Sequence, residues 1–171
     1  MILVSIDPGL RGCGCAAWKD GLLHRAAYVS GQNTLEEKNL SRLVENTTRW
    51  VARWILDARA GAFQIDALEL VIEYPQTYGG RAAKGDANDL IGITLVAGAI
   101  LGLVQAPTRL VRPAEWKGQV PKQTIHGTNP IELRARGKLS PAELERMDLL
   151  HKRLQHNVWD AVGIGLATLG R

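Results

Sequence analysis

Cysteine, aromatic residues and long apolar runs are all scarce in this chain of 171 residues. It has two cysteines, one phenylalanine and 5% aromatic residues in total. Cys13 and Cys15 are only two residues apart, and we expect their side chains to point to opposite faces of a strand, which disfavours a disulfide between them. Without further cysteines or clustered histidines, the sequence also excludes a zinc site.

Neither a membrane span nor a targeting segment is expected. The longest uncharged apolar run, Leu90 to Val104, is too short to cross a bilayer as a helix. No basic start and no cleavage site precede the first apolar stretch, so we expect no signal peptide. A content of 46% hydrophobic and 22% charged residues is typical of a soluble globular protein. We therefore expect one domain over residues 1–171 of a reduced, cytoplasmic protein that has no membrane partner.

Positive charge is concentrated in one part of the chain. The formal net charge is +4, and residues 109–153 hold ten Lys or Arg against five Asp or Glu. The rest of the chain holds eleven against twelve. A basic stretch beside a nearly neutral body indicates a polyanionic partner such as nucleic acid, although many basic surfaces are merely solvated.

The hydrophobic pattern predicts a mixed α/β sheet covered by helices. Three consecutive strands come first, and strands then alternate with helices. Residues from 113 onward are basic and predicted to be irregular, until Pro141 begins a helix with Ser140 as its N-cap. The predicted strands are 2–6, 13–18, 22–29, 67–72 and 108–111, and the predicted helices are 35–60, 87–104 and 157–169.

Three acidic residues occupy unusual positions. Asp7 and Glu73 each directly follow a buried strand, and Asp160 lies in a helix that is otherwise apolar. Singly, Asp7 could form a turn, Glu73 could pair with an arginine and Asp160 could be solvated. Together they indicate one pocket, because a carboxylate at the end of a buried strand needs a compensating cation. Hard carboxylate oxygens without clustered Cys or His suit Mg²⁺ or Mn²⁺.

The segments around these acids resemble those of one nuclease family. Residues 5–14, Ser-Ile-Asp-Pro-Gly-Leu-Arg-Gly-Cys-Gly, are similar to the opening strand and turn of RuvC-type Holliday junction resolvases. Residues 71–73, Val-Ile-Glu, resemble the second acidic strand of that family, and residues 159–167 resemble its C-terminal acidic helix. The matches come in the order of the family and cover nearly the whole chain. The compact middle suggests a bacteriophage-encoded member, which would act in the host cytoplasm.

The resemblance implies a ribonuclease-H-like fold, an α/β fold with a mixed five-stranded sheet flanked by helices. It also implies a homodimer and a hydrolase of DNA recombination and repair, a crossover junction endodeoxyribonuclease. Such an enzyme uses divalent metal, with a pair of Mg²⁺ or Mn²⁺ ions in each site, to cleave paired strands of a four-way DNA junction. By position, Asp7, Glu73 and Asp160 match metal ligands of the family, and Lys117 and Lys122 lie where the family has functional lysines.

The loop after Glu73 adds candidate DNA contacts. Tyr74 and Tyr78 could stack on unpaired bases, and Arg81 and Lys84 could hold phosphates. The two tyrosines could equally pack a turn. The apolar helix over residues 87–104 carries Gly98 and Gly102, a spacing that permits close helix approach and a dimer interface.

A further residue of the site lies one helical turn before Asp160. The family usually has an Asp or His there, whereas Asn157 and His156 stand three and four residues before Asp160 in this chain. Asn157 matches the family spacing as a metal ligand, but it could instead cap the helix. His156 accepts a proton near neutral pH and could activate the attacking water. We favour His156 as the catalytic residue.

Other functions stay open at this point. The chain could be another ribonuclease-H-like nuclease that acts on RNA or on simpler branched DNA. It could also bind branched DNA without cutting it, although a pure binder would gain nothing from acidic groups that face phosphates. The sequence does not indicate a preferred cleavage sequence, metal ion or source.

Overall fold

The computed structural model describes residues 1–31, 37–60, 67–75, 87–118, 129–149 and 152–171. Its strands are β1 (Ile2–Asp7), β2 (Cys13–Lys19), β3 (Leu22–Val29), β4 (Leu68–Glu73) and β5 (Thr108–Val111). The helices are α1 (Leu40–Ala60), α2 (Ala87–Val104), α3 (Pro113–Lys117), α4 (Pro130–Arg136), α5 (Pro141–Leu144), the 3₁₀ helix η2 (Lys152–Leu154) and α6 (Gln155–Thr168).

The five strands form one mixed sheet in the order β3-β2-β1-β4-β5. β1 pairs antiparallel with β2 and parallel with β4, and β4 pairs parallel with β5. β1 is therefore the central strand, where a largely apolar segment such as Ile2 to Ile6 is expected. The prediction of a mixed five-stranded α/β sheet is confirmed.

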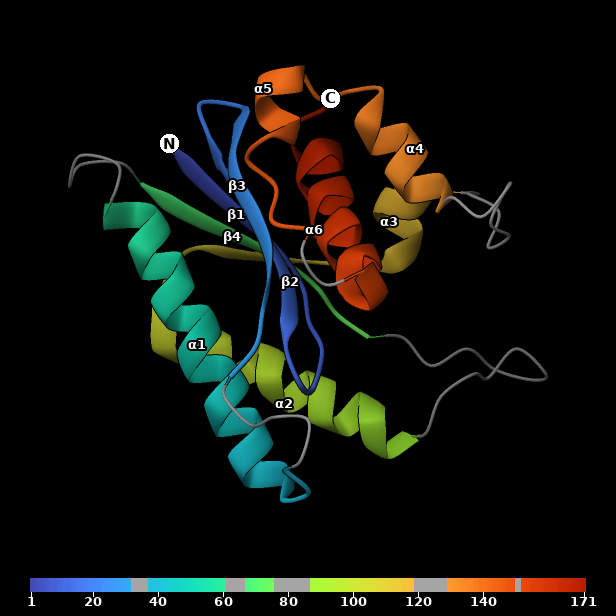
Figure 1. Cartoon of the computed structure of the whole chain (residues 1–171). Coiled ribbons are helices and arrows are strands. Elements are labelled where there is room, and N and C mark those ends of the chain that lie inside the picture. The colour runs from blue at the N-terminus through green and yellow to red at the C-terminus, as the bar shows by residue number, and fades with distance from the viewer. Residues whose placement is uncertain (32–36, 61–66, 76–86, 119–128, 150–151) are drawn as a thin grey trace.

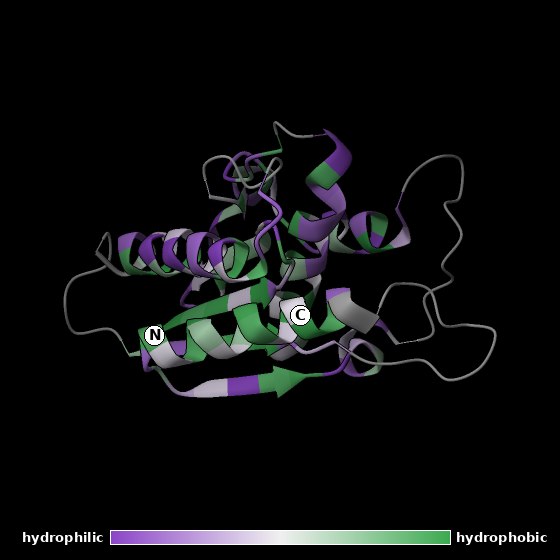
Figure 2. Ribbon diagram, turned by 90° about the horizontal axis from the view of Figure 1, so that it is seen from below, coloured by the Kyte–Doolittle hydropathy of each residue, from purple (hydrophilic) through white to green (hydrophobic). Residues whose placement is uncertain are grey.

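Helices cover both faces of this sheet (Figure 1). α1 and α2 pack on one face, where their buried residues join Ile2, Val4 and Ile6 in one hydrophobic cluster. α6 packs on the opposite face, flanked by α3, α4 and α5, and forms a second cluster with Leu3 and Val71. The helices carry both hydrophobic and hydrophilic colouring, as expected of helices that pack on a sheet with one face only (Figure 2). None of the helices in the described ranges is long and apolar enough to cross a membrane.

Most element boundaries agree with the prediction, and the short helices α3, α4 and η2 were missed. β3, α2 and β5 have the predicted bounds. The prediction of irregular structure from residue 113 was wrong for α3 and α4, which each begin at a proline in the first turn. Asn129 caps α4 by accepting a hydrogen bond from the Ile131 amide. Helices this short carry no apolar period that the sequence could reveal.

Three smaller predictions also need correction. α1 begins at residue 40, after Asn39 accepts hydrogen bonds from the amides of Ser41 and Arg42. The predicted cap Asn157 lies inside α6, whose N-cap is Leu154. Cys13 and Cys15 are unpaired but lie in the same cluster, because residues two apart on a strand share a face.

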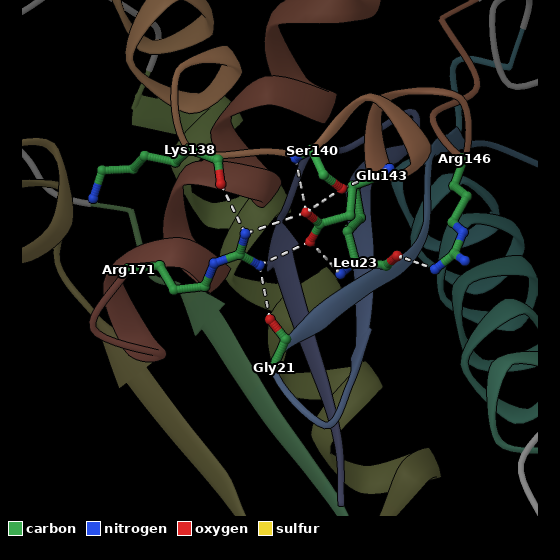
Figure 3. Close-up of polar contacts among 7 residues, drawn as sticks. All are labelled: Gly21, Leu23, Lys138, Ser140, Glu143, Arg146 and Arg171. Atoms are coloured by element: carbon green, nitrogen blue, oxygen red, sulfur yellow. Dashed lines mark hydrogen bonds and ion pairs between the residues drawn. The ribbon is translucent and has the colours of Figure 1, made fainter.

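A buried ion pair fixes the end of the chain (Figure 3). Glu143 is only 3% exposed, and its carboxylate accepts hydrogen bonds from the Leu23 amide and the Ser140 hydroxyl. Arg171 lies 2.8 Å from the same carboxylate and also donates to the carbonyls of Gly21 and Lys138. The hydrogen bond from Arg171, with those from Leu23 and Ser140, lowers the pKa of Glu143 to about 2.

We predict that Arg171→Ala lowers the free energy of unfolding by about 1.5–3 kcal/mol, the size expected when a buried carboxylate is deprived of one charged hydrogen-bond donor. Arg49→Ala, which breaks the exposed pair with Glu45, should cost only about 0.3–0.5 kcal/mol. The measurement is urea unfolding of both variants. Equal losses would show that Arg171 contributes no more than a surface charge.

The contribution of Arg171 should also depend on pH. Because folding depresses the pKa of Glu143, its ionised form stabilises the folded state above the ordinary pKa of 4.5. This stabilisation should disappear as the pH falls from about 4.5 to about 2. The stability difference between wild type and Arg171→Ala should therefore shrink over the same interval.

Candidate active site

Two of the predicted carboxylates lie at adjacent strand ends. Ile6 of β1 pairs with Ile72 of β4 in parallel register, so Asp7 and Glu73 follow at the same edge of the sheet. Alternation along the strands places both side chains on the face covered by α6, since Leu3 and Val71 on that face belong to the α6 cluster. The carboxyl ends of parallel strands are the usual position of a binding site.

α6 brings the third carboxylate to the same place. The Ser5 hydroxyl donates to the Ala161 carbonyl at 2.8 Å and accepts from the Trp18 indole at 3.0 Å. The first of these bonds links β1 to Ala161, the residue of α6 that directly follows Asp160. Gly14 makes the close packing sterically feasible, because a Cβ there would lie 1.9 Å from the Asn157 carbonyl oxygen.

Lys117 at the end of α3 connects two of the three carboxylates. Its ammonium lies 3.0 Å from Oδ2 of Asp160 and 3.7 Å from Oε2 of Glu73. The exposed fractions of the Lys117, Asp160 and Glu73 side chains are 29%, 14% and 13%, so all three are largely buried. The structure therefore places Lys117 between Asp160 and Glu73.

Trp116 contributes a second contact that the sequence analysis missed. Its indole N–H donates to Oε2 of Glu73, and the indole lies against α6 at Gly163. A Cβ at Gly163 would approach Cζ3 of Trp116 to 2.5 Å, so the absence of a side chain there makes room for the ring. One sequence feature could have indicated this role: Trp116 stands between two charged residues of a basic segment, next to the candidate Lys117.

Burial and mutual repulsion make ionisation of the carboxylates unfavourable. Burial raises the pKa of Asp7 well above its ordinary value, and the charges of Asp160 and Glu73 raise it further. Burial also raises the pKa of Asp160 and of Glu73, although Lys117 partly offsets this effect for both. Burial disfavours the charge of Lys117, but Asp160 and Glu73 outweigh it and raise its pKa. One ammonium thus compensates three acids only in part.

These residues fit a divalent cation by their chemistry. Within the described residues, Oδ1 of Asp160 is buried and has no hydrogen-bond partner, so this oxygen is available to a cation, and its burial without a partner is costly. Oxygen ligands alone suit Mg²⁺ or Mn²⁺. The described side chains do not form a group of three or more His, Cys, Asp or Glu that is already arranged to hold a metal ion, and Lys117 lies between two of the candidate ligands.

The two candidates on the first turns of α6 differ in environment. His156 is exposed, and its Nδ1 lies 3.1 Å from the Arg153 carbonyl. A carbonyl only accepts, so this hydrogen bond requires the proton on Nδ1 and leaves Nε2 as the basic nitrogen. The charge of His156 lowers the pKa of Asp160, which places the imidazole within electrostatic reach. Asn157 is half-buried beside Gly14 on β2.

Most of the predicted DNA contacts fall on parts of the chain that are not described. Tyr78, Arg81, Lys84 and Lys122 lie outside the described residues. Tyr74 is half-buried, and its backbone N–H donates to the Val111 carbonyl at 3.0 Å.

Comparison with solved structures gives the class of fold. RuvC of Thermus thermophilus in complex with a Holliday junction substrate matches with a TM-score of 0.56 and 16% identity, over 98% of this chain and 92% of that chain. A second Thermus thermophilus RuvC structure matches at 0.55 and 18%, with the same coverage. The chain therefore has a ribonuclease-H-like fold, as predicted.

The comparisons with known proteins support the fold alone. No protein-family model matches the sequence, and no curated protein is significantly similar to it. A polyphosphate/ATP-glucomannokinase from Arthrobacter sp. strain KM covers 99% of both chains at 14% identity, but its TM-score of 0.48 is too low to support an inference. At these identities, the matches do not fix a reaction.

We predict that Asp7→Asn raises the melting temperature at pH 7. A carboxyl whose pKa is raised by folding destabilises the folded state once the pH exceeds its ordinary value of 3.8. The amide removes this cost, so the difference between variant and wild type should vanish below pH 3.8. Thermal unfolding followed by circular dichroism at several pH values measures both effects.

Mg²⁺ should reverse the order of stability. Saturation at a hundred times the dissociation constant would stabilise the wild type by about 2.7 kcal/mol and the Asp7→Asn variant by much less. Glu69→Gln is the matched control, since it removes an acid on the same face of β4 outside the cluster. An equal Mg²⁺ effect on wild type and Asp7→Asn would contradict metal binding by Asp7.

Proposed function

We propose that the protein is a divalent-metal-dependent endonuclease that selects four-way DNA junctions and hydrolyses paired phosphodiester bonds. The observation that carries this proposal is the convergence of Asp7, Glu73 and Asp160 around one lysine at the strand ends. The likeness in fold to a RuvC structure that holds a Holliday junction substrate supports the choice of DNA as the substrate. Basic residues are concentrated in the same half of the chain as Lys117.

Each residue has a defined role in this proposal. Asp7, Glu73 and Asp160 would hold the metal, which when bound supplies charge to stabilise the attacking and leaving oxygens. Lys117 neutralises part of the acidic charge and is placed to stabilise a phosphate oxygen that enters the site. Trp116 keeps Glu73 oriented through its indole N–H. Lys122, in the same basic segment, is proposed as a second phosphate contact.

His156 is proposed to accept the proton of the attacking water. Its hydrogen bond to the Arg153 carbonyl leaves Nε2 basic, as a general base requires. Asn157 offers only a neutral amide, which is a weak ligand and takes no proton. We therefore assign the proton transfer to His156 and retain Asn157 as the alternative metal ligand.

Cleavage of a synthetic four-way junction, compared with linear duplex, tests the proposal. Wild type should cut only the junction and only with Mg²⁺ or Mn²⁺. Asp7→Asn, Glu73→Gln and Asp160→Asn should each lower the rate by roughly a hundredfold or more, while the control Glu69→Gln cuts normally. Junction binding without cutting would instead indicate a binding module, and preferential cutting of RNA or simpler branches would indicate another nuclease of this fold.

Single-turnover assays separate the two α6 candidates. His156→Ala should reduce the cleavage rate by roughly a hundredfold, within the usual range for loss of a general base. Asn157→Ala should cost far less, because a neutral amide cannot replace the base. The reverse ranking would transfer the role to Asn157.

The exposed face of α2 is proposed as the homodimer interface. Ile91 and Leu95 are 55% and 48% exposed, and Gly98 and Gly102 continue the same stripe at helical spacing. A Cβ at either glycine would meet nothing within 4 Å, so the stripe is open to a second helix. A two-fold dimer would present two equivalent sites to the two equivalent strands of a junction.

Gly98→Leu should weaken self-association without disturbing the monomer, because the position is open in the described structure. Gly137→Leu is the matched control, since Gly137 is also exposed but lies at the end of α4. Sedimentation at micromolar concentration should show a wild-type dimer, a more dissociated Gly98→Leu variant and an unchanged control. A monomeric wild type, with or without junction DNA, would contradict the interface.

A further inference from the structure

The Lys117 ammonium bridges two carboxylates, as a metal ion shared by two ligands would. It lies 3.0 Å from Oδ2 of Asp160 and 3.7 Å from Oε2 of Glu73. It also lies 4.6 Å from the centre of the Trp116 ring, a distance at which the face of an aromatic ring attracts a cation. Three neighbours therefore hold the ammonium in this position, and two of them are acids of the candidate site.

The carboxylate oxygens that face Lys117 are already engaged. Oε2 of Glu73 accepts a hydrogen bond from the Trp116 indole and lies beside the ammonium. Oδ2 of Asp160 accepts a hydrogen bond from the ammonium. A divalent ion could take these two oxygens only if the ammonium moved away, because two cations at one pair of oxygens repel each other.

The second oxygen of Asp160 has a different environment. Oδ1 is buried and lacks a hydrogen-bond partner among the residues that the structure describes. Ser5 and Asp7 point to the same face of β1, because they are two residues apart. The Ser5 hydroxyl donates to the carbonyl of Ala161, directly after Asp160 in α6. This bond brings the Asp7 end of β1 close to Asp160.

Asp7 and Asp160 also influence each other electrostatically. Burial raises the pKa of Asp7, and the charge of Asp160 raises it more than the charge of Glu73 does. The Asp7 carboxylate and Oδ1 of Asp160 are thus two oxygen ligands in one buried place. Two carboxylates are enough for Mg²⁺, which usually keeps several water molecules in its coordination shell.

The charge of the cluster agrees with a single ion. Three ionised carboxylates in a poorly solvated place need three positive charges nearby. Lys117 supplies one of these charges, and one divalent ion supplies the other two. A second divalent ion beside the lysine would give the cluster a net positive charge, which burial also disfavours.

We propose that the site binds one divalent ion, held by Asp7 and Oδ1 of Asp160, and that the Lys117 ammonium takes the place of a second ion between Asp160 and Glu73. The proposal deepens the proposed function and rests on it for the metal. The resemblance to RuvC-type resolvases implies a pair of ions, and this chain differs from that expectation. Lys117 supplies positive charge and N–H donors to a phosphate oxygen, where a second ion would supply charge.

The number of Mn²⁺ ions bound per chain tests the proposal. Wild type should bind one Mn²⁺ in titrations followed by calorimetry and by the EPR signal of free Mn²⁺. Lys117→Met should bind two, because loss of the ammonium frees Oδ2 of Asp160 and Oε2 of Glu73. Lys152→Met is the matched control, since Lys152 is an exposed lysine of η2 outside the cluster. This control should bind one ion.

The EPR spectrum of bound Mn²⁺ gives a second readout that does not depend on activity. Two ions that share Asp160 would lie roughly 3.5–4 Å apart, and their electron spins would couple. Lys117→Met should show this coupling, whereas wild type should give the spectrum of an isolated ion. Lys117→Arg keeps a positive charge at the position and should also give the spectrum of an isolated ion.

The Mg²⁺ dependence of cleavage extends the test to the DNA-bound state. In single-turnover assays on junction DNA, the wild-type rate should rise hyperbolically with the Mg²⁺ concentration, as expected when one ion is needed. A sigmoidal dependence would show that a second ion enters with the DNA and would overturn the proposal.

The possible results separate this proposal from the proposed function. Two Mn²⁺ ions in wild type, or one ion in both wild type and Lys117→Met, would overturn the proposal and leave a metal-dependent nuclease intact. The wild-type count decides the first case even if Lys117→Met does not fold. Wild type that neither binds Mn²⁺ nor cuts junctions with any divalent ion would contradict the proposed function, and this proposal with it.

Discussion

Burial of three carboxylates at one edge of the sheet is the constraint on which the rest of the structure depends. Parallel pairing of β1 with β4 places Asp7 beside Glu73, and α6 adds Asp160. Charges of the same sign in a poorly solvated place destabilise the fold unless a cation compensates them. Lys117 supplies one positive charge, which leaves the pKa of Asp7 raised. Buried acids with raised pKa values that lie close together are typical of functional sites.

The surrounding contacts hold the acids in place despite their repulsion. The Ser5 hydroxyl links β1 to α6, and the absence of a side chain at Gly14 lets that helix approach β2. On the other side, Trp116 packs against Gly163 and donates to Glu73. The far end of α6 leads to Arg171, which Glu143 retains by a buried ion pair. The helix that carries Asp160 is thus anchored near both of its ends.

The fold by itself is compatible with more than one class of reaction. The arrangement of charged residues is the feature on which the proposed reaction depends. As the proposed metal ligands, the three carboxylates would suit phosphoryl chemistry together with the adjacent Lys117. The basic residues of α4 lie on the same side of the sheet as α6. The open apolar stripe of α2 lies on the opposite face of the sheet from α6, so self-association there would leave the acidic face available for DNA.

The sequence by itself determined the strands, the long helices and the three acids at strand and helix positions. These features are local: apolar runs, a helical period and a charge that interrupts a buried segment are visible within a few residues. The short helices α3 and α4 were missed because five and seven residues are too few to show a period. Only the tertiary structure decided that Trp116 binds Glu73 and that Lys117 bridges Glu73 and Asp160. Each of these partners is separated by 43 or 44 residues, and no local pattern selects one partner over another. Such contacts follow from helix packing on the assembled sheet, which a sequence read in short windows does not contain.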